Sequence, residues 1–267
     1  MTATKRYAYR CDGLAGEVFL DPTRSPNSVA IFCFGFPGTI GPNPIVNLLA
    51  ASGYAVVVHQ YAGTYDSDGY FTPQASVDSI TTIAHRLAEG NFTDIKKGNP
   101  IPIGDYPQTK LIVGHSFGCF LGGRAATQIR GVEAVLLLAP ILGYGHVPFE
   151  YGVLEDGIAQ LEYVRRARPH TYRFSDLDDW RALFRGERNS WSPRQINAKR
   201  VLAVVGDADP DFNVRLIVPA FPAILTSLYG RTVQGSISVV PGAGHSVDDL
   251  LTDEVKEWVL QATARNI

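Results

Sequence analysis

The run Gly114-His115-Ser116-Phe117-Gly118 holds one serine between two glycines. It follows the apolar stretch Leu111-Ile112-Val113 and precedes a segment rich in glycine and alanine, which predicts a strand, a tight turn and a slim helix. Side chains two residues before and after a serine in such a turn would collide with the strand and the helix, so both positions favour glycine. A serine displayed in this way is typical of a covalent nucleophile, and we predict this role for Ser116.

A nucleophilic serine needs a base, and His245 is the candidate. It follows the strand expected at Ser236–Val240, and the glycines beside it leave the loop free to bring the imidazole to the serine. We expect His115 to point away from the serine and to serve packing. The remaining histidines, for which core, surface or lid positions are expected, are His59, His85, His146 and His170. No histidine pair has the spacing of metal ligands, so neither a metal nor a cofactor is expected.

The acid that would orient the base is sought in Gly206-Asp207-Ala208-Asp209-Pro210-Asp211, which follows the apolar run Arg200–Val205. Three carboxylates compete here. Each also suits an ordinary structural role, because aspartate is common in turns and at helix N-caps. The residue types alone therefore leave the choice open.

Short apolar runs alternate with segments of helical periodicity from residue 28 onward, which predicts an α/β class with a mostly parallel sheet. The expected strands are Ser28–Phe34, Tyr54–His59, Thr109–Val113, Ala134–Leu138, Arg200–Val205 and Ser236–Val240, with an antiparallel edge at Tyr7–Cys11 and Glu17–Leu20. The expected helices are Pro44–Ala51, Ser76–Ala88, Phe117–Ile129, Val214–Leu228 and Asp248–Thr263.

This order of elements, together with the serine turn, resembles the α/β-hydrolase superfamily from Ser28 to the C-terminus. The resemblance implies a catalytic triad in the chain order Ser, Asp, His. It selects Asp209, which stands three residues after a glycine and before a proline, ahead of Asp207. It also implies that the backbone N–H groups of Phe36 and Phe117 form an oxyanion hole.

The oxyanion loop Phe34-Gly35-Phe36-Pro37-Gly38 departs from the superfamily pattern, because Phe34 stands where a histidine is usual. The donor is a backbone group, so the chemistry should survive, but the loop must be braced in another way. The loop from Gln60 to Gly69 also resembles a superfamily loop, although it lacks the arginine, and it makes Tyr61 a possible substrate contact.

Residues 142–197 interrupt the strand and helix rhythm and predict a small helical lid, here named the insertion. Residues 1–141 and 198–267 would then form the hydrolase core. An amphipathic stretch at Val153–Arg166 predicts one helix of the insertion. The aromatic side chains of the insertion suit a medium-sized apolar or aromatic acyl group, and those named as possible substrate contacts are Tyr151, Tyr172, Trp180 and Trp191.

Composition argues against some partners. A net charge of −2 gives no broad footprint for nucleic acid or an anionic membrane, so a small acyl compound is the expected partner. Three cysteines at wide spacings indicate a reducing compartment. With no signal-like or membrane-spanning run, a cytoplasmic location is expected.

The leading hypothesis is a serine hydrolase that cleaves a carboxylic ester or thioester through an acyl-enzyme on Ser116. A peptidase or amidase on the same triad is the first alternative. Acidic residues of the insertion (Glu150, Glu155 and 176–179) could then meet a substrate amine, although a solvated face is the favoured interpretation of these residues. A lyase and a binding protein on the same fold also remain open.

Overall fold

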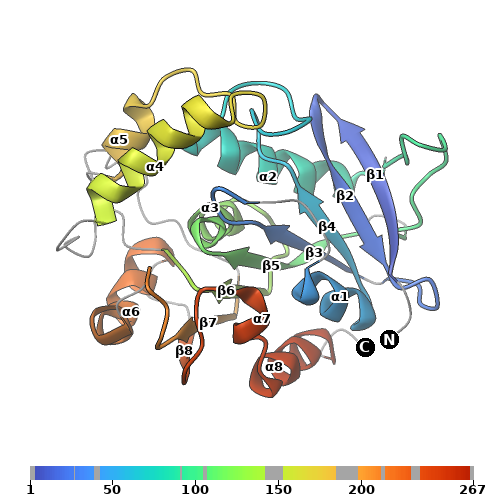
Figure 1. Cartoon of the computed structure of the whole chain (residues 1–267). Coiled ribbons are helices and arrows are strands. Elements are labelled where there is room, and N and C mark those ends of the chain that lie inside the picture. The colour runs from blue at the N-terminus through green and yellow to red at the C-terminus, as the bar shows by residue number, and fades with distance from the viewer. Residues whose placement is uncertain are drawn as a thin grey trace.

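The central element is one eight-stranded sheet with the strand order β1-β2-β4-β3-β5-β6-β7-β8 (Figure 1). The computed structural model describes residues 4–26, 28–38, 43–90, 92–104, 107–141, 153–184, 198–211, 214–229 and 235–264. The strands are β1 (Lys5–Cys11), β2 (Leu14–Leu20), β3 (Ser28–Cys33), β4 (Tyr54–His59), β5 (Thr109–His115), β6 (Ala134–Leu138), β7 (Arg200–Gly206) and β8 (Gly235–Val240). Strand β2 runs antiparallel to β1 and β4, and the other neighbours are parallel.

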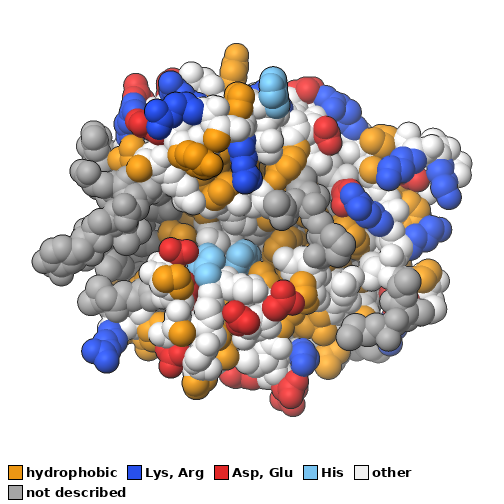
Figure 2. Space-filling view, in the orientation of Figure 1, with side chains coloured by type: hydrophobic (Ala, Val, Ile, Leu, Met, Phe, Trp, Pro, Cys, Tyr) orange, Lys and Arg blue, Asp and Glu red, His pale blue; other side chains and the backbone are white. Residues whose placement is uncertain are grey.

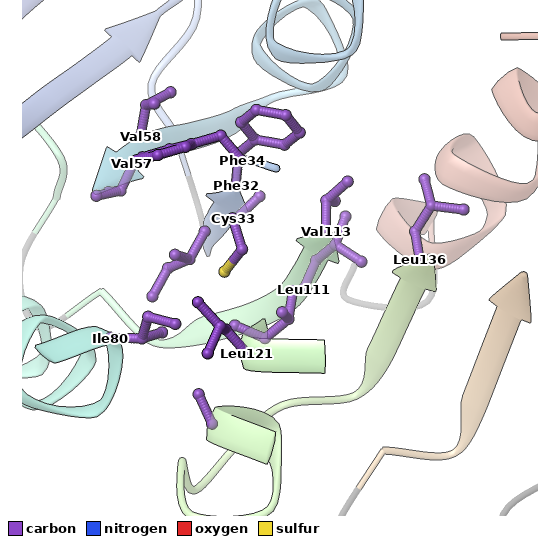
Figure 3. Close-up of a cluster of buried hydrophobic side chains, with 14 of the residues drawn as sticks. Phe32, Cys33, Phe34, Val57, Val58, Ile80, Leu111, Val113, Leu121 and Leu136 are labelled. Atoms are coloured by element: carbon purple, nitrogen blue, oxygen red, sulfur yellow. The ribbon is translucent and has the colours of Figure 1, made fainter. Parts of the chain in front are cut away.

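Helices cover both faces of this sheet. They are α1 (Pro44–Ala51), α2 (Pro73–Ala88), α3 (Phe117–Ala126), α6 (Val214–Tyr229), α7 (Val247–Leu250) and α8 (Asp253–Ala264). Helices α2 and α3 lie on one face, and α1 and α8 lie on the other (Figure 1). Strands β3 and β4 are buried along their whole length, and Figure 3 shows side chains of β3, β4 and β5 packed with Ile80 and Leu121 of the covering helices. Burial on both faces explains the continuous apolar runs of these strands.

The predicted α/β-hydrolase architecture is confirmed, with some element boundaries corrected. The helix expected at Asp248–Thr263 is divided into α7 and α8, because the backbone of Leu251 leaves the helical region at ψ 64°. Helix α2 begins three residues before the predicted start, since the Thr72 side chain accepts a hydrogen bond from the backbone N–H of Ala75 and caps the helix. Helix α3 ends at Ala126 rather than at Ile129.

The described part of the insertion contains two helices, α4 (Val153–Ala167) and α5 (Asp178–Phe184). Figure 1 shows them side by side, outside the layers that cover the sheet and close to α2. Between them, Tyr172 forms an isolated antiparallel bridge with Thr64 of the loop that follows β4. The insertion is therefore attached to the core by backbone pairing.

None of the helices in the described ranges is both long enough and apolar enough to cross a membrane.

Candidate active site

Ser116 lies in a strained turn between the end of β5 and the start of α3. Its φ and ψ are 55° and −126°, a conformation that costs a residue with a side chain about 1–3 kcal/mol. A Cβ added at Gly114 would overlap the backbone of Cys119, and one added at Gly118 would overlap the carbonyl group of Cys33. The side chain of Ser116 makes no capping hydrogen bond to α3, so the turn displays the hydroxyl group instead of using it locally.

The structure brings His245 and Asp209 together. The His245 Nδ1 lies 2.7 Å from the Asp209 Oδ2, and the Asp209 side chain is 0% exposed. The other carboxylate oxygen of Asp209 accepts a hydrogen bond of 2.8 Å from the backbone N–H of Asp211. Asp207 is exposed and accepts from the backbone N–H of Gly242, so it holds the loop after β8 rather than the histidine ring.

The charges around His245 favour its protonated form. Burial lowers the pKa of the imidazole, but the hydrogen bond and charge of Asp209 and the charge of Asp211 outweigh burial, and the pKa is raised. The Asp211 Oδ2 lies 3.9 Å from the same Nδ1. Since Nδ1 is bound to Asp209, Nε2 is the nitrogen left to exchange protons in the cavity.

His115 was expected to point away from the serine, and the structure corrects this prediction. Strand β5 continues through His115, and its side chain lines the same cavity as Ser116. Its Nε2 donates a hydrogen bond of 2.8 Å to the carbonyl oxygen of His245. Burial lowers the pKa of His115, although the contact with that carbonyl opposes the shift. A neutral His115 therefore fixes the backbone of the loop that carries His245.

The oxyanion loop, residues 34–38, lies directly against Ser116. A Cβ added at Gly35 would lie 2.9 Å from the Ser116 Cβ and 3.4 Å from its Oγ. Phe36 and Phe117 both line the cavity beside Ser116. Phe117 begins α3, and the N-terminus of a helix favours negative charge. Both backbone positions expected to stabilise an oxyanion thus belong to the wall around the serine.

These side chains share one cavity of about 820 Å³. Figure 2 shows histidine side chains inside a hollow of the surface, below helices α4 and α5. The described lining residues are Phe32, Phe34, Gly35, Phe36, Pro37, Gly38, Asn43, Pro44, His115, Ser116, Phe117, Ile141, Gly157, Gln160, Leu161, Trp180, Pro210, Asp211, His245, Ser246, Val247 and Asp248. This described lining contains two carboxylates, Asp211 and Asp248, and neither lysine nor arginine.

The five aromatic residues named from the sequence as possible substrate contacts have different positions. Trp180 lines the cavity but is 0% exposed, and its indole N–H donates to the carbonyl oxygen of Phe71 at 3.0 Å. Tyr61 and Tyr172 are buried and absent from the described lining, and their hydroxyl groups are hydrogen-bonded to the oxyanion loop. Tyr151 and Trp191 lie outside the described residues.

The acidic residues of the insertion that a peptidase could use for a substrate amine are described only in part. Asp176, Asp178 and Asp179 are absent from the described lining. Glu150 and the side chain of Glu155 lie outside the described residues. Two other carboxylates do line the cavity: Asp211, in the loop after β7, and Asp248, in helix α7, which follows β8.

Within the described ranges, one group of side chains has donor atoms close enough to hold a metal ion. It comprises Asp209, Asp211 and His245, whose ligand atoms lie within 4.8 Å of one another. Within this group the Asp209 Oδ2 is hydrogen-bonded to the His245 Nδ1 at 2.7 Å, as in an acid and base pair.

A serine turn after β5, an acid after β7 and a histidine after β8 together define the α/β-hydrolase arrangement. The chain belongs to the Alpha/beta hydrolase family, which it matches over residues 19–259. The predicted superfamily membership is confirmed.

Solved structures with this fold include several esterases and a lipase. An esterase from Pyrococcus furiosus superposes with a TM-score of 0.63 at 14% identity, covering 99% of this chain and 91% of that one. A hyperthermophilic esterase from Pyrobaculum calidifontis gives 0.57 at 15% identity, covering 99% and 85%. A monoacylglycerol lipase from Paleococcus ferrophilus gives 0.55 at 16% identity, covering 97% and 99%. No curated protein matches the chain in sequence.

Proposed function

We propose that the protein is a serine hydrolase that cleaves uncharged carboxylic esters. The observation that carries this proposal is the 2.7 Å contact between the buried Asp209 and His245, which lines the same cavity as Ser116. His245 would take the proton of the Ser116 hydroxyl while Oγ attacks the ester carbonyl carbon. The N–H groups of Phe36 and Phe117 would stabilise the oxyanion.

The rest of the cycle uses the same groups. The protonated His245 gives its proton to the departing alcohol, which leaves an acyl group on Ser116. His245 then deprotonates a water molecule that attacks the acyl carbonyl, and the second tetrahedral intermediate releases the carboxylic acid and regenerates the hydroxyl. Asp209 holds the imidazole in the required tautomer and stabilises the imidazolium in both halves.

The charge of the cavity wall supports an uncharged ester ahead of a thioester. Thioesters on a phosphate-bearing carrier would bring negative charge to a wall whose described lining includes Asp211 and Asp248 and no basic side chain. The repulsion between the phosphate and these carboxylates would weaken binding of such a thioester. The apolar part of the described wall, with Phe36, Ile141 and Leu161, suits a neutral acyl group.

An amidase or peptidase on the same triad is the second candidate. It is favoured by the same two carboxylates, because Asp211 and Asp248 could accept a substrate ammonium group. Parallel assays with p-nitrophenyl esters and the corresponding p-nitroanilides, each with and without a free amine, would separate the two. Neutral esters should be turned over fastest, and faster cleavage of amine-bearing anilides would make the second candidate the better one.

Covalent labelling tests the nucleophile. A fluorophosphonate probe should label the wild-type protein and should not label Ser116→Ala, whose kcat for a p-nitrophenyl ester should fall by about 10⁶-fold. Ser236→Ala, which removes an exposed hydroxyl group on β8, should remain labelled and active. An unlabelled wild type, or equal labelling of Ser116→Ala, would show that the protein is a lyase, a binding protein or another non-hydrolytic member of the fold.

A further inference from the structure

The oxyanion loop is held by three tyrosine hydroxyl groups. At its first residue, the Tyr61 hydroxyl donates to the carbonyl oxygen of Phe34 at 2.7 Å. At its last residue, the Tyr65 and Tyr172 hydroxyls both donate to the carbonyl oxygen of Gly38, the second at 3.1 Å. The N–H of Gly38 also donates to the Tyr172 oxygen at 2.9 Å. Tyr172 therefore holds both polar groups of one residue.

The loop has little room to move between these two attachments. A Cβ at Gly38 would overlap the carbonyl oxygen of Gly35, so the loop closes tightly on itself. Gly35 in turn packs against Ser116. The Phe36 ring is enclosed by aromatic rings, stacked on Phe71 at 5.5 Å and edge-on to Tyr172 at 5.0 Å between ring centroids. Fixing Gly38 thus fixes the position of Phe36 relative to the nucleophile.

Tyr172 differs from the other two tyrosines because it belongs to the insertion. It is 1% exposed, and the backbone on both sides of it is paired with the loop after β4. The N–H of Tyr65 donates to the carbonyl of Thr171 at 2.8 Å, and the N–H of Arg173 donates to that of Gly63 at 2.8 Å. The segment of the insertion that carries Tyr172 is therefore hydrogen-bonded to the core, and from this position the Tyr172 hydroxyl reaches the oxyanion loop.

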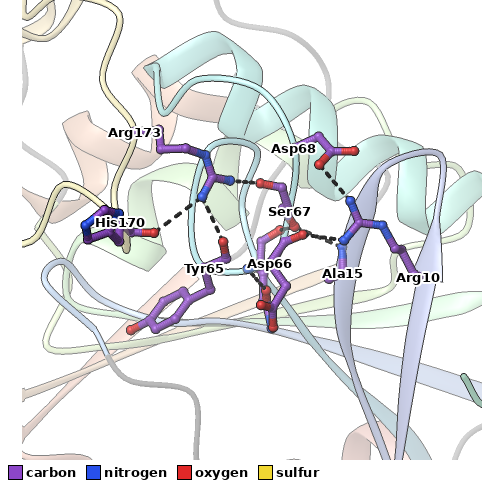
Figure 4. Close-up of polar contacts among 9 residues, drawn as sticks. Arg10, Ala15, Tyr65, Asp66, Ser67, Asp68, His170 and Arg173 are labelled. Carbon is purple, nitrogen blue, oxygen red and sulfur yellow. Dashed lines mark hydrogen bonds and ion pairs between the residues drawn. The ribbon is translucent and has the colours of Figure 1, made fainter. Parts of the chain in front are cut away.

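The side chain of Arg173 secures this pairing. Figure 4 shows its guanidinium group directed at three carbonyl oxygens, those of Tyr65, Ser67 and His170. The neighbouring loop is tied in turn to β1 and β2, since Arg10 donates to Asp66 and Asp68, and the N–H of Ala15 donates to the Ser67 hydroxyl. The attachment of Tyr172 is thus rigid on both sides.

We propose that Tyr172 is a positioning residue for the oxyanion hole, through which the insertion holds the Phe36 amide against Ser116. This inference rests on the proposed function. With Phe34 at its first position, the loop has no side-chain donor there, and hydroxyl groups from outside the loop supply the hydrogen bonds. Burial raises the pKa of Tyr172, as does its proximity to Tyr65, so the hydroxyl stays protonated and keeps its donor over the working pH range.

The test is Tyr172→Phe, which removes the hydroxyl and keeps the ring. We expect kcat for a p-nitrophenyl ester to fall about tenfold, less than the 10²- to 10³-fold of a lost oxyanion donor, with KM changed less than about twofold. Tyr163→Phe is the matched control, because Tyr163 lies on α4 of the same insertion and is 62% exposed. Its kcat should equal that of the wild type.

A trifluoromethyl ketone distinguishes positioning from a general loss of structure. Ser116 Oγ adds to its carbonyl carbon, the proton passes to His245, and the resulting oxyanion needs the same donors as the transition state. Its affinity should fall by the same factor as kcat/KM in Tyr172→Phe, whereas the pH profile should keep its shape. If that variant fails to fold, Tyr65→Phe removes a hydrogen bond to the same Gly38 carbonyl and should show the same pattern with a smaller factor.

Two outcomes would overturn the proposal separately. Wild-type kcat and inhibitor affinity in Tyr172→Phe, or an effect confined to KM, would show that the hydroxyl does not position the oxyanion hole, although Ser116→Ala would still be inactive. Full activity of Ser116→Ala would overturn the proposed function, and the positioning role with it.

Discussion

The oxyanion loop and the loops that carry His245 and Asp209 lie on two sides of Ser116 and are held by different interactions. The oxyanion loop at residues 34–38 is bound by neutral phenol groups and enclosed by aromatic rings. The loops that carry His245 and Asp209 are bound by carboxylates and backbone groups. Asp207 accepts from Gly242 there, and His115 donates to the backbone of His245. The surroundings of the oxyanion loop therefore stay neutral, whereas the loops that carry His245 and Asp209 contain the groups that titrate.

This difference assigns the pH dependence of the proposed reaction to one side of the serine. Burial raises the pKa values of Tyr61 and Tyr172, so these phenols remain neutral at any pH at which the protein would work. His245 has a raised pKa because Asp209 and Asp211 outweigh its burial. A base must be neutral to accept the serine proton, so activity should rise with pH as His245 loses its proton.

The largest effect in this comparison is expected for Asp209→Asn. It should lower kcat about 10⁴-fold, because an amide in place of the buried carboxylate stabilises the wrong histidine tautomer. Asp207→Asn is the matched control and should lower kcat less than about tenfold, since Asp207 contacts only the loop after β8. Steady-state kinetics with one p-nitrophenyl ester measures both. The reverse order of the two effects would assign the acid to Asp207.

On the oxyanion side, kcat should be most sensitive to added side-chain volume. Gly35→Ala would place a methyl group 2.9 Å from the Ser116 Cβ, and a displacement costing 1–3 kcal/mol should lower kcat about 10- to 100-fold. Gly98→Ala is the control. Gly98 has a φ of +70° with nothing within 4 Å of an added Cβ, so this variant should lose stability without losing kcat. Equal kcat in both variants would show that the loop moves freely beside the serine.

The sequence predicts the fold well because buried strands need apolar side chains on both faces, and β3 to β7 are such runs. It predicts the proposed nucleophile and base because their positions follow from strand order. It does not separate Asp209 from Asp207 by residue type, because both follow β7 and only the three-dimensional structure shows which carboxylate is buried. The resemblance to a family, and not the residue types, selected Asp209.

The positions of Tyr172 and His115 were not predictable in the same way. Tyr172 reaches Gly38 across 134 positions of the chain, and no local pattern specifies such a contact. His115 was taken as a packing residue because it lies inside the serine turn, yet β5 extends through it and its ring faces the loop of His245. A departure from the family pattern at Phe34 was the one signal that the oxyanion loop needed other partners.

Arg173→Met tests whether the pairing between the insertion and the core supports the oxyanion side. The guanidinium group donates to the carbonyl of Tyr65 at 2.8 Å, and its loss should lower the free energy of unfolding by about 2 kcal/mol. The kcat should fall about threefold, since Tyr172 is displaced but keeps its hydroxyl. Arg165→Met, on the exposed face of α4, should change neither quantity. Denaturant unfolding and ester kinetics measure the two effects, and lost stability with unchanged kcat would separate the pairing from catalysis.

The smallest expected effect belongs to the titrating side. The charge of Asp211 helps to raise the pKa of His245 from 3.9 Å, so Asp211→Asn should lower that pKa. His245 would then stay neutral to a lower pH, and the acid limb of the kcat/KM profile should move to lower pH. The shift should be small and should shrink at high salt, because the Asp211 side chain is 65% exposed.

Two variants serve as controls. Asp176→Asn changes an exposed carboxylate of the insertion outside the cavity lining and should leave the acid limb in place, as should Tyr172→Phe on the neutral side. A limb that moves to higher pH in Asp211→Asn, or that moves equally in Tyr172→Phe, would contradict the division between a neutral and a titrating loop.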